Sequence, residues 1–196
     1  MYENNCFITL TLNDKYLQKR GYPSSTDKKE LQRFWKRLRR KYNKRIRYYA
    51  SSEYGENFDR PHYHACLFNH DFMDKKFFKT SPSGERLYTS DELHDLWTCP
   101  IHKEPMGYAY IGDLTFESAA YVARYCTKKI TGQDAASHYV DEYGVVKEPE
   151  SQYCSTDPGI GKPWFDKYKE DVINQDHVVL YGIKHPVPRY YDKLLE

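Results

Sequence analysis

The segment RPHYHACLF, residues 60–68, places two histidines one residue apart inside an apolar run. A short apolar run of this kind is typical of a β-strand within a sheet. Side chains two positions apart on a strand leave the same face, so His62 and His64 are expected to point together while Tyr63 points the other way. The segment therefore predicts a sheet that carries a pair of imidazoles on one face.

The order of apolar and polar segments predicts an α+β domain around a central, mainly antiparallel sheet of about five strands. Strands are expected at residues 6–12, 46–55, 62–68 and 106–114, with one or two more in the C-terminal part. The polar residues 69–88 and the acidic residues 131–160 are expected to be loops. Flanking helices are expected mainly on one side. The chain fits one domain, residues 1–196, with a C-terminal extension from about residue 150 as the only subdivision we expect.

A helix is predicted from residue 28 to residue 41. Asp27 followed three residues later by Glu30 is typical of a capping box at a helix start. Apolar side chains then recur at helical spacing, at Leu31, Phe34, Trp35 and Leu38. The helix is therefore expected to bury this stripe and to expose its opposite face.

The exposed face of this helix is strongly basic. Between Lys28 and Arg47, eleven Lys or Arg residues accompany a single Glu, a density that favours contact with phosphate. The alternative is a solvated outer surface, which many charged helix faces are. The residues of this face that we assign to DNA contact are Arg33, Lys36, Arg37, Arg39 and Arg40.

A third metal ligand is available near the two histidines. Glu53 lies near the end of the preceding predicted strand, and an antiparallel pairing brings it beside His62 and His64. Glu56 and Asp59 compete for this position, because the sequence does not fix the register. Two imidazoles and one carboxylate leave open positions on a divalent ion, as a catalytic metal requires. The alternative for the histidines alone is a pair of partly buried side chains that bond to their neighbours.

The segment FESAAYVARYCTKK, after Thr115, is predicted to be a helix. Its residues Tyr121, Arg124, Tyr125 and Lys128 share one face. A tyrosine hydroxyl has a pKa near 10, so it becomes a nucleophile only toward a polarised electrophile or beside a cation. A metal bound to phosphate supplies the first condition, and Lys128 the second, with Arg124 or Lys129 sharing its role. The alternative is a pair of core aromatics.

These motifs resemble a known family. FITLTLND, RPHYHACLF and YVARYCTKK occur in the order found in HUH endonucleases that initiate rolling-circle replication. Four longer blocks resemble the replication initiators of small single-stranded DNA phages, the gokushovirus branch of the microviruses; they are SSEYGENFDRPHYHACLF, IGDLTFESAAYVARYCTKKITG, PGIGKPWF and RYYDKLLE. The resemblance covers nearly the whole chain and implies the HUH endonuclease fold with its RRM-like palm.

The resemblance also implies an activity. One tyrosine attacks a phosphate at the viral origin, forms a 5′-phosphotyrosine and frees a 3′-hydroxyl that primes replication, and a second tyrosine later releases and closes the displaced circle. Tyr121 and Tyr125 match the tyrosine pair. Glu53, His62 and His64 match the metal triad, for which Mg²⁺ or Mn²⁺ is implied. The implied partners are single-stranded origin DNA, linear or folded as a hairpin, and host replication proteins such as a helicase and a polymerase.

Several other classes are disfavoured by the sequence. No stretch approaches the roughly 20 apolar residues that span a bilayer, and no signal-like start precedes the first strand, so we expect a soluble protein in the cytoplasm of a bacterial host, without membrane partners. Five cysteines without a C-x-x-C pair disfavour a disulfide framework or a zinc ribbon. The segment GIGK, residues 159–162, lacks the spacing and the Ser or Thr of a nucleotide-binding P-loop, and is expected to be a turn before a helix.

Three rival functions remain at this stage. A transposase or relaxase of the HUH type shares the chemistry but acts on another substrate. A noncatalytic single-strand-binding module predicts neither metal-dependent chemistry nor a covalent adduct. A zinc-dependent hydrolase predicts water as the nucleophile in place of tyrosine.

Overall fold

The computed structural model describes residues 1–22, 24–55, 58–128, 130–141 and 143–196, without the side chains of residues 125–128 and 133. The chain divides into two compact units. One unit spans residues 2–153, and the other comprises residues 154–196 together with Met1. The larger unit contains every candidate site residue predicted from the sequence.

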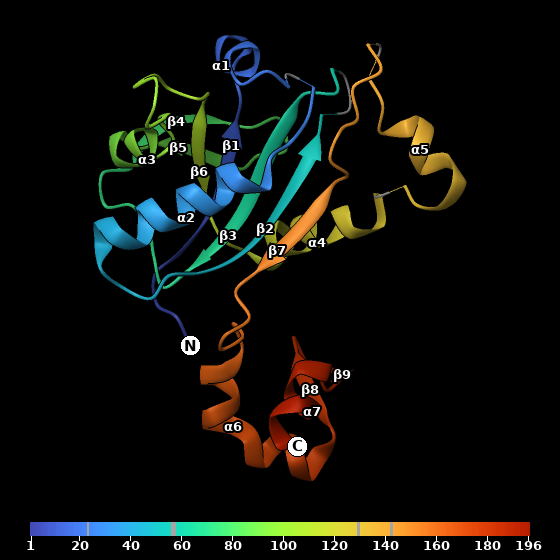
Figure 1. Cartoon of the computed structure of the whole chain (residues 1–196). Helices are drawn as coiled ribbons and strands as arrows, with labels where there is room; N and C mark the ends of the chain where they lie inside the picture. The colour runs from blue at the N-terminus through green and yellow to red at the C-terminus, as the bar shows by residue number, and fades with distance from the viewer. Residues whose placement is uncertain (23, 56–57, 129, 142) are drawn as a thin grey trace. The chain divides into compact units, whose positions relative to one another are not determined.

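The larger unit is built on a seven-stranded sheet in the order β4-β5-β6-β1-β3-β2-β7 (Figure 1). Its strands are β1 (Asn5–Thr11), β2 (Arg47–Tyr54), β3 (Pro61–Phe68), β4 (Lys76–Thr80), β5 (Arg86–Thr89), β6 (Ala109–Gly112) and β7 (Ser151–Cys154). Each neighbouring pair from β4 to β2 is antiparallel. The α+β class and the antiparallel sheet are thus confirmed, although the sheet is wider than expected.

The additional strands come from two segments whose prediction as loops was wrong. β4 and β5 form a hairpin within residues 69–88, and β7 lies within residues 131–160. Every residue of β4 is exposed, so this edge strand lacks the apolar alternation that marks a half-buried strand. Gly84 adopts a φ of 89° in the connecting turn, which favours glycine. Hydrogen bonding to the sheet, more than burial, therefore defines this hairpin.

Helix α2 (Lys28–Tyr42) covers one face of the sheet and buries the predicted apolar stripe (Figure 1). The short helix α3 (Asp91–Leu96) lies on the same side, since Trp97 at its end contacts the rings of Phe34 and Tyr63, each at a centroid distance of 5.8 Å. The Asp27 side chain accepts a hydrogen bond from the Lys29 amide at 2.7 Å, as expected of an N-cap.

The reciprocal half of the capping box was predicted wrongly. Glu30 does not bond back to the Asp27 amide. That amide donates to the hydroxyl of Tyr63 at 2.8 Å. The Glu30 carboxylate instead turns into the core, where it meets Arg20 and Tyr63. A buried cation and hydroxyl need an acceptor more than a helix end that Tyr63 already satisfies.

Helix α4 (Phe116–Lys128) covers the other face and contacts β2 and β3 (Figure 1). Thr115 accepts a hydrogen bond from the Ser118 amide at 3.2 Å, which fits the predicted helix start. The side-chain amide of Gln152, on β7, donates to the carbonyls of Val122 and Ala123 at 2.9 and 3.1 Å. Tyr49 on β2 donates to Gln152 at 2.8 Å, so these contacts tie α4 to the strands beneath it.

Short elements complete the larger unit: α1 (Asp14–Lys19), the 3₁₀ turn η1 (Gly132–Asp134) and α5 (Ala135–His138). The smaller unit contains α6 (Lys162–Gln175), the hairpin of β8 (His177–Leu180) and β9 (Ile183–Pro186), and α7 (Arg189–Leu195).

The GIGK segment is a turn that leads into α6, as predicted. The Gly159 amide donates to the hydroxyl of Tyr190 at 2.7 Å, and a Cβ at this position would lie 2.5 Å from that ring. Trp164 stacks on Tyr191 at a centroid distance of 5.5 Å, while Phe165 is buried. The glycines therefore allow close packing of aromatic rings in this unit.

Candidate metal and tyrosine site

The strand registers place the predicted ligands side by side. Glu53 on β2 is directly opposite His62 on β3, and Ser51 is opposite His64. On the other side of β3, Thr9 of β1 is opposite His64. Residues directly opposite in an antiparallel pair share a face, so all of these side chains belong to the face that α4 covers.

The three ligand atoms of Glu53, His62 and His64 all lie within 4.8 Å of one another. Oε1 of Glu53 lies 2.7 Å from Nε2 of His64 and 3.4 Å from Nε2 of His62. Of the two competing carboxylates, Asp59 forms an ion pair with Lys147, and Glu56 lies outside the described residues. The geometry thus favours Glu53 as the carboxylate of the cluster.

Electrostatics give the cluster a clear charge preference. Burial raises the pKa of Glu53, but the imidazoles of His62 and His64 outweigh burial and hold that pKa at about 2. The pKa of His62 is raised because its attraction to the Glu53 carboxylate exceeds the cost of burial. Burial lowers the pKa of His64. An ionised carboxylate therefore stands between two imidazoles and favours positive charge at this position.

Contacts at the outer nitrogens orient both imidazoles. Nδ1 of His62 lies 3.0 Å from the carbonyl oxygen of Arg60, so a protonated Nδ1 donates to that oxygen. Nδ1 of His64 lies 2.9 Å from the hydroxyl of Thr9. With these nitrogens protonated, both Nε2 lone pairs face the carboxylate. Partners of this kind fix the orientation of metal-binding histidines in proteins.

Buried oxygens at the centre of the cluster test whether a cation fits. Oε1 of Glu53 is buried and accepts no well-aligned hydrogen bond from any residue that the structure describes. The hydroxyl of Ser51, on the same face, is likewise buried without a partner in the described part of the chain. Buried acceptors without donors are costly, and a cation bound by Oε1 and two Nε2 atoms removes that cost for the carboxylate. The residues present therefore fit a divalent metal ion.

Of the two predicted tyrosines, the structure describes the side chain of Tyr121. Its ring lies edge-on to that of His64 at a centroid distance of 5.1 Å and contacts Phe7 at 6.5 Å. Phe7 in turn stacks on His64 at 5.5 Å. The tyrosine helix and the histidine strand therefore meet at this cluster.

The other predicted residues of α4 are described in part. Tyr125 and Lys128 belong to the helix, but their side chains lie outside the described part of the structure, and Lys129 lies outside the described residues altogether. Arg124 is exposed on α4, one turn beyond Tyr121.

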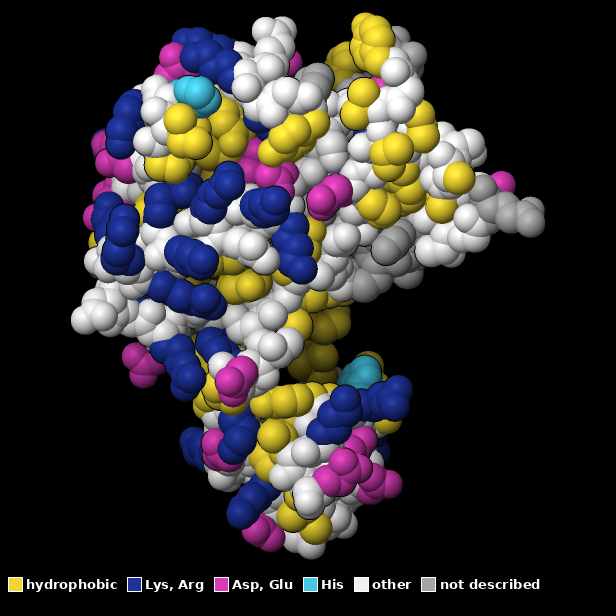
Figure 2. Space-filling model, in the orientation of Figure 1, with side chains coloured by type: hydrophobic (Ala, Val, Ile, Leu, Met, Phe, Trp, Pro, Cys, Tyr) yellow, Lys and Arg dark blue, Asp and Glu magenta, His cyan; other side chains and the backbone are white. Residues whose placement is uncertain are grey.

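The basic surface of α2 lies on the opposite face of the sheet from this cluster (Figure 2). Two of its predicted DNA-contacting residues bind backbone carbonyls within the protein. Arg37 donates to the carbonyl of Leu96 at 2.7 and 3.1 Å, and Arg39 donates to that of Ile46 at 3.1 and 3.2 Å. Arg33, Lys36 and Arg40 are exposed. The sheet thus separates this basic surface from the metal cluster.

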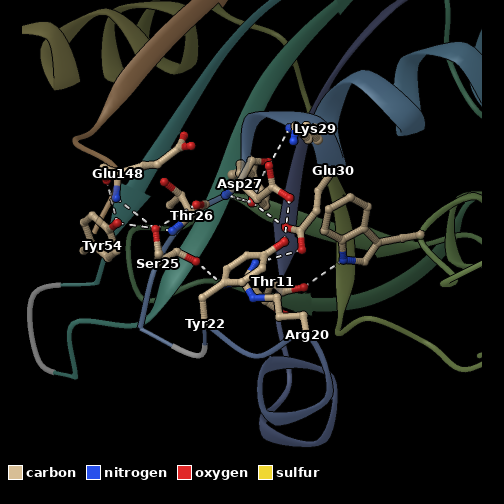
Figure 3. A network of polar contacts seen from close by, with 12 residues as sticks. Thr11, Arg20, Tyr22, Ser25, Thr26, Asp27, Lys29, Glu30, Tyr54 and Glu148 are labelled. Atoms are coloured by element: carbon tan, nitrogen blue, oxygen red, sulfur yellow. Dashed lines mark hydrogen bonds and ion pairs between the residues drawn. The ribbon is translucent and has the colours of Figure 1, made fainter. Parts of the chain in front are cut away.

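Tyr63, between the two histidines, anchors β3 to α2 from the opposite face. Its hydroxyl donates to Oε2 of Glu30 at 2.5 Å, and Oε1 of the same carboxylate lies 2.8 Å from Nη1 of Arg20. Figure 3 shows how Arg20, Tyr22, Asp27 and Glu30 converge in this network. Because Tyr63 is fully buried, its contacts restrict the strand that carries the histidines.

The sequence analysis did not identify Thr9 or Phe7 as partners of His64. The alternation in FITLTL contained a usable signal, because Phe7, Thr9 and Thr11 share one face while Ile8 and Leu10 take the other. Only the register of β1 against β3 shows which histidine each residue meets. The polar face of the first strand therefore belongs to the site.

Comparisons with known proteins address the chain as a whole. The sequence model of a family described as replication-associated protein ORF2 matches residues 5–130, which include the metal cluster and α4. No solved structure matches the chain. Among the described residues, none of the helices is long and apolar enough to cross a membrane.

Curated relatives match along almost the entire chain. The replication-associated protein VP4 of Bdellovibrio phage phiMH2K is 32% identical over 97% of the chain, and ORF2 of Spiroplasma virus 4 is 34% identical over 99%. The replication-associated protein ORF4 of Chlamydia phage 1 is 27% identical over 99%. The chain spans 58%, 58% and 46% of the lengths of these relatives, respectively. The resemblance to phage replication proteins is thus confirmed, and the chain belongs to the family of the replication-associated protein ORF2.

Proposed function

We propose that this chain is an HUH endonuclease that nicks and rejoins single-stranded DNA at a phage origin, initiating and terminating rolling-circle replication. The observation that carries the proposal is the meeting of a tyrosine helix with a His–His–Glu cluster: the ring of Tyr121 lies 5.1 Å from that of His64. Membership in a family of replication-associated proteins supports a DNA substrate.

Glu53, His62 and His64 would hold the metal, for which we propose Mg²⁺ or Mn²⁺. When bound, such an ion supplies a Lewis acid that polarises a phosphate oxygen. Two nitrogen ligands also accept other transition metals, so availability decides which ion binds. Thr9 and the Arg60 carbonyl keep the imidazoles oriented toward the carboxylate.

The nucleophile is the hydroxyl of Tyr121 or Tyr125, one helical turn apart on α4. Its oxygen forms a bond to phosphorus as the bond from phosphorus to the 3′ oxygen breaks. The phenol loses one proton and the departing 3′ oxygen gains one, so charge and atoms balance. We assign Lys128 to stabilising the phenolate, and Arg124 and Lys129 to holding the neighbouring phosphates. The second tyrosine then resolves the 5′-phosphotyrosine link by the same exchange.

The remaining assignments follow from this reaction. The DNA partner is a single-stranded origin, linear or folded as a hairpin, and the exposed residues Arg33, Lys36 and Arg40 contact phosphates that lie away from the nick. Arg37 and Arg39, already bound to carbonyls, contribute charge to the same surface. Strand separation and synthesis require a helicase and a polymerase of the host, which places the reaction in the bacterial cytoplasm. We propose residues 1–196 as one HUH endonuclease module with residues 154–196 as its C-terminal extension.

The test uses overlapping single-stranded oligonucleotides that cover the genome encoding this chain, each labelled at its 3′ end. With Mn²⁺ or Mg²⁺ present, one oligonucleotide is expected to yield label that migrates with the protein on a denaturing gel. The same oligonucleotide labelled at its 5′ end is expected to yield a shortened strand with a free 3′-hydroxyl. EDTA and the His62→Ala substitution should each abolish both products.

Tyrosine variants then identify the nucleophile. We expect reduced adduct in Tyr121→Phe and Tyr125→Phe, and none in the double variant. Tyr143→Phe serves as the matched control, because Tyr143 is 82% exposed and lies outside the cluster and α4. Cleavage without an adduct would show that water is the nucleophile and identify a metal hydrolase. Binding without cleavage of any oligonucleotide would identify a noncatalytic DNA-binding module.

A further inference from the structure

Three aromatic side chains form a row on the sheet face that carries the metal cluster. The rings of Phe78 and Tyr110 stack at a centroid distance of 5.4 Å and an angle of 20°, and those of Tyr110 and Tyr108 at 6.0 Å and 19°. Tyr108 is 65% exposed and Phe78 49%. Single exposed aromatics are ordinary on protein surfaces, but a contiguous exposed row commonly marks a binding site.

The registers connect this row with the cluster. Tyr110 on β6 is directly opposite Thr9 on β1, and Thr9 is directly opposite His64 on β3. Only β1 separates the two strands, so Tyr110 and His64 lie about 10 Å apart across the sheet. The backbone of Tyr108 bonds with the hydroxyl of Thr11, which is opposite His62. The row therefore lies beside the cluster, on the same face.

A β-bulge in the edge strand brings Phe78 into the row. Phe77 is opposite Tyr88 and Lys79 is opposite Leu87, which leaves Phe78 as the extra residue between them. Tyr88 packs against the core on the opposite face, so Phe77 also points to that face. The bulge lets the consecutive residues Phe78 and Lys79 both reach the cluster's face. Nζ of Lys79 lies 5.4 Å from the centre of the Phe78 ring.

This arrangement has the chemistry that single-stranded nucleic acid requires. Bases stack on exposed aromatic rings irrespective of sequence, while a neighbouring cation attracts the phosphates. From the row and its place in the sheet we infer that Phe78, Tyr110 and Tyr108 are a platform on which bases of the single strand stack as it enters the metal cluster, with Lys79 as its phosphate contact. This inference rests on the proposed function and names the binding surface for its substrate.

The experiment measures the binding of a short fluorescent oligodeoxythymidine by anisotropy in EDTA, where no metal-dependent cleavage occurs. The Phe78→Ala/Tyr108→Ala double variant is expected to bind about five- to a hundredfold more weakly than the wild type. An abasic oligonucleotide of equal length has the same phosphates but no bases, so its affinity should not change in this variant. Both substituted side chains are exposed, and matching thermal melts would verify that the variant folds.

Two control variants separate stacking from a general surface effect. Tyr108→Phe keeps the ring and should retain the wild-type affinity. Phe77→Ala removes a side chain that is 57% exposed and adjacent in sequence but points to the opposite face, and it should also bind normally. Weakening by Phe77→Ala equal to that of the double variant, or equal losses for the abasic strand, would overturn the platform.

The outcomes distinguish this inference from the proposed reaction. Base-dependent binding in a chain that forms no covalent adduct would support the platform and overturn only the nicking reaction. An adduct formed by the wild type, together with unchanged oligodeoxythymidine affinity in the double variant, would overturn only the platform. Self-association of the wild type that the double variant loses would make a second copy of the chain the occupant of the row, and would also overturn it.

Discussion

Tyr63 and its neighbours His62 and His64 leave opposite faces of strand β3 and meet opposite environments. Toward α2, the Tyr63 hydroxyl and both oxygens of Glu30 have hydrogen-bond or ion-pair partners. Toward α4, Oε1 of Glu53 is just as buried but has no well-aligned donor among the described residues. One face thus completes its polar contacts within the chain, whereas the other is arranged for a cation from outside it. This difference separates the residues that stabilise the fold from those that we expect to perform chemistry.

The largest effect is expected from breaking the closed face. Glu30→Gln removes the charge that faces Arg20, and both side chains are at least 95% buried. Removing one partner of a buried ion pair costs about 3–5 kcal/mol, so the free energy of unfolding in urea should fall by this amount. Glu3→Gln, at an exposed carboxylate, is the matched control and should leave it unchanged. Equal stabilities of Glu30→Gln and the wild type would show that the network does not stabilise the fold.

On the open face, substitution should change metal binding more than folding. Mn²⁺ at a hundredfold excess over its Kd stabilises a folded protein by about 2.7 kcal/mol. Glu53→Gln should abolish this gain in thermal melts with Mn²⁺. Without metal it should melt close to the wild type, because the amide donates to an imidazole nitrogen that had only an acceptor opposite. A large loss of stability without metal would show that Glu53 is a structural residue like Glu30.

A smaller effect is expected from the support of His64. Thr9→Val keeps the shape of the side chain but removes the hydroxyl that lies 2.9 Å from Nδ1. Loss of such an orienting partner lowers metal affinity about 10- to 100-fold, which calorimetric titration with Mn²⁺ would measure. The control is Thr80→Val on the exposed edge strand β4, which should bind Mn²⁺ normally. Unchanged affinity in Thr9→Val would indicate that packing against Phe7 alone orients the imidazole.

The smallest effect comes from an exception on the closed face. His70 is buried against Tyr42 and Phe72, and neither ring nitrogen has a partner in the described part of the chain. Burial, aided by Lys44, lowers its pKa to about 4. The unfolded chain takes up this proton near pH 6.5 and the folded chain only near pH 4, so the stabilisation is present above pH 6.5 and is lost as pH falls toward 4.

Urea titrations at several pH values would measure the contribution of His70. Between pH 7 and pH 5.5 the loss should be about 1 kcal/mol. His70→Phe, which keeps an aromatic ring between Tyr42 and Phe72, should remove this part of the pH dependence. His62 has the opposite sign, because its raised pKa gives stability below pH 6.5 that is lost as pH rises through the folded value. An unchanged slope in His70→Phe would assign the pH dependence to other groups.

Local sequence patterns predicted most of what periodicity and composition can express. The stripe from Leu31 to Leu38 identified the buried face of α2, and the H-x-H alternation identified the shared face of His62 and His64. Glu53 was selected among three carboxylates only as a hypothesis, because the sequence does not state a strand register. Edge strands such as β4 were missed, since an exposed strand has no apolar alternation to detect.

By itself, the sequence determined which residue types recur at which spacing, and therefore the class of fold, the family and the ligands and tyrosines that chemistry would select. The tertiary structure alone decided which of these residues meet. It placed the basic helix and the metal cluster on opposite faces of one sheet, directed Glu30 into the core, and used a bulge to align Phe78 with Tyr110. The reason is physical: periodicity is a property of a single segment, whereas register, facing side and burial depend on free energies shared between segments distant in the chain.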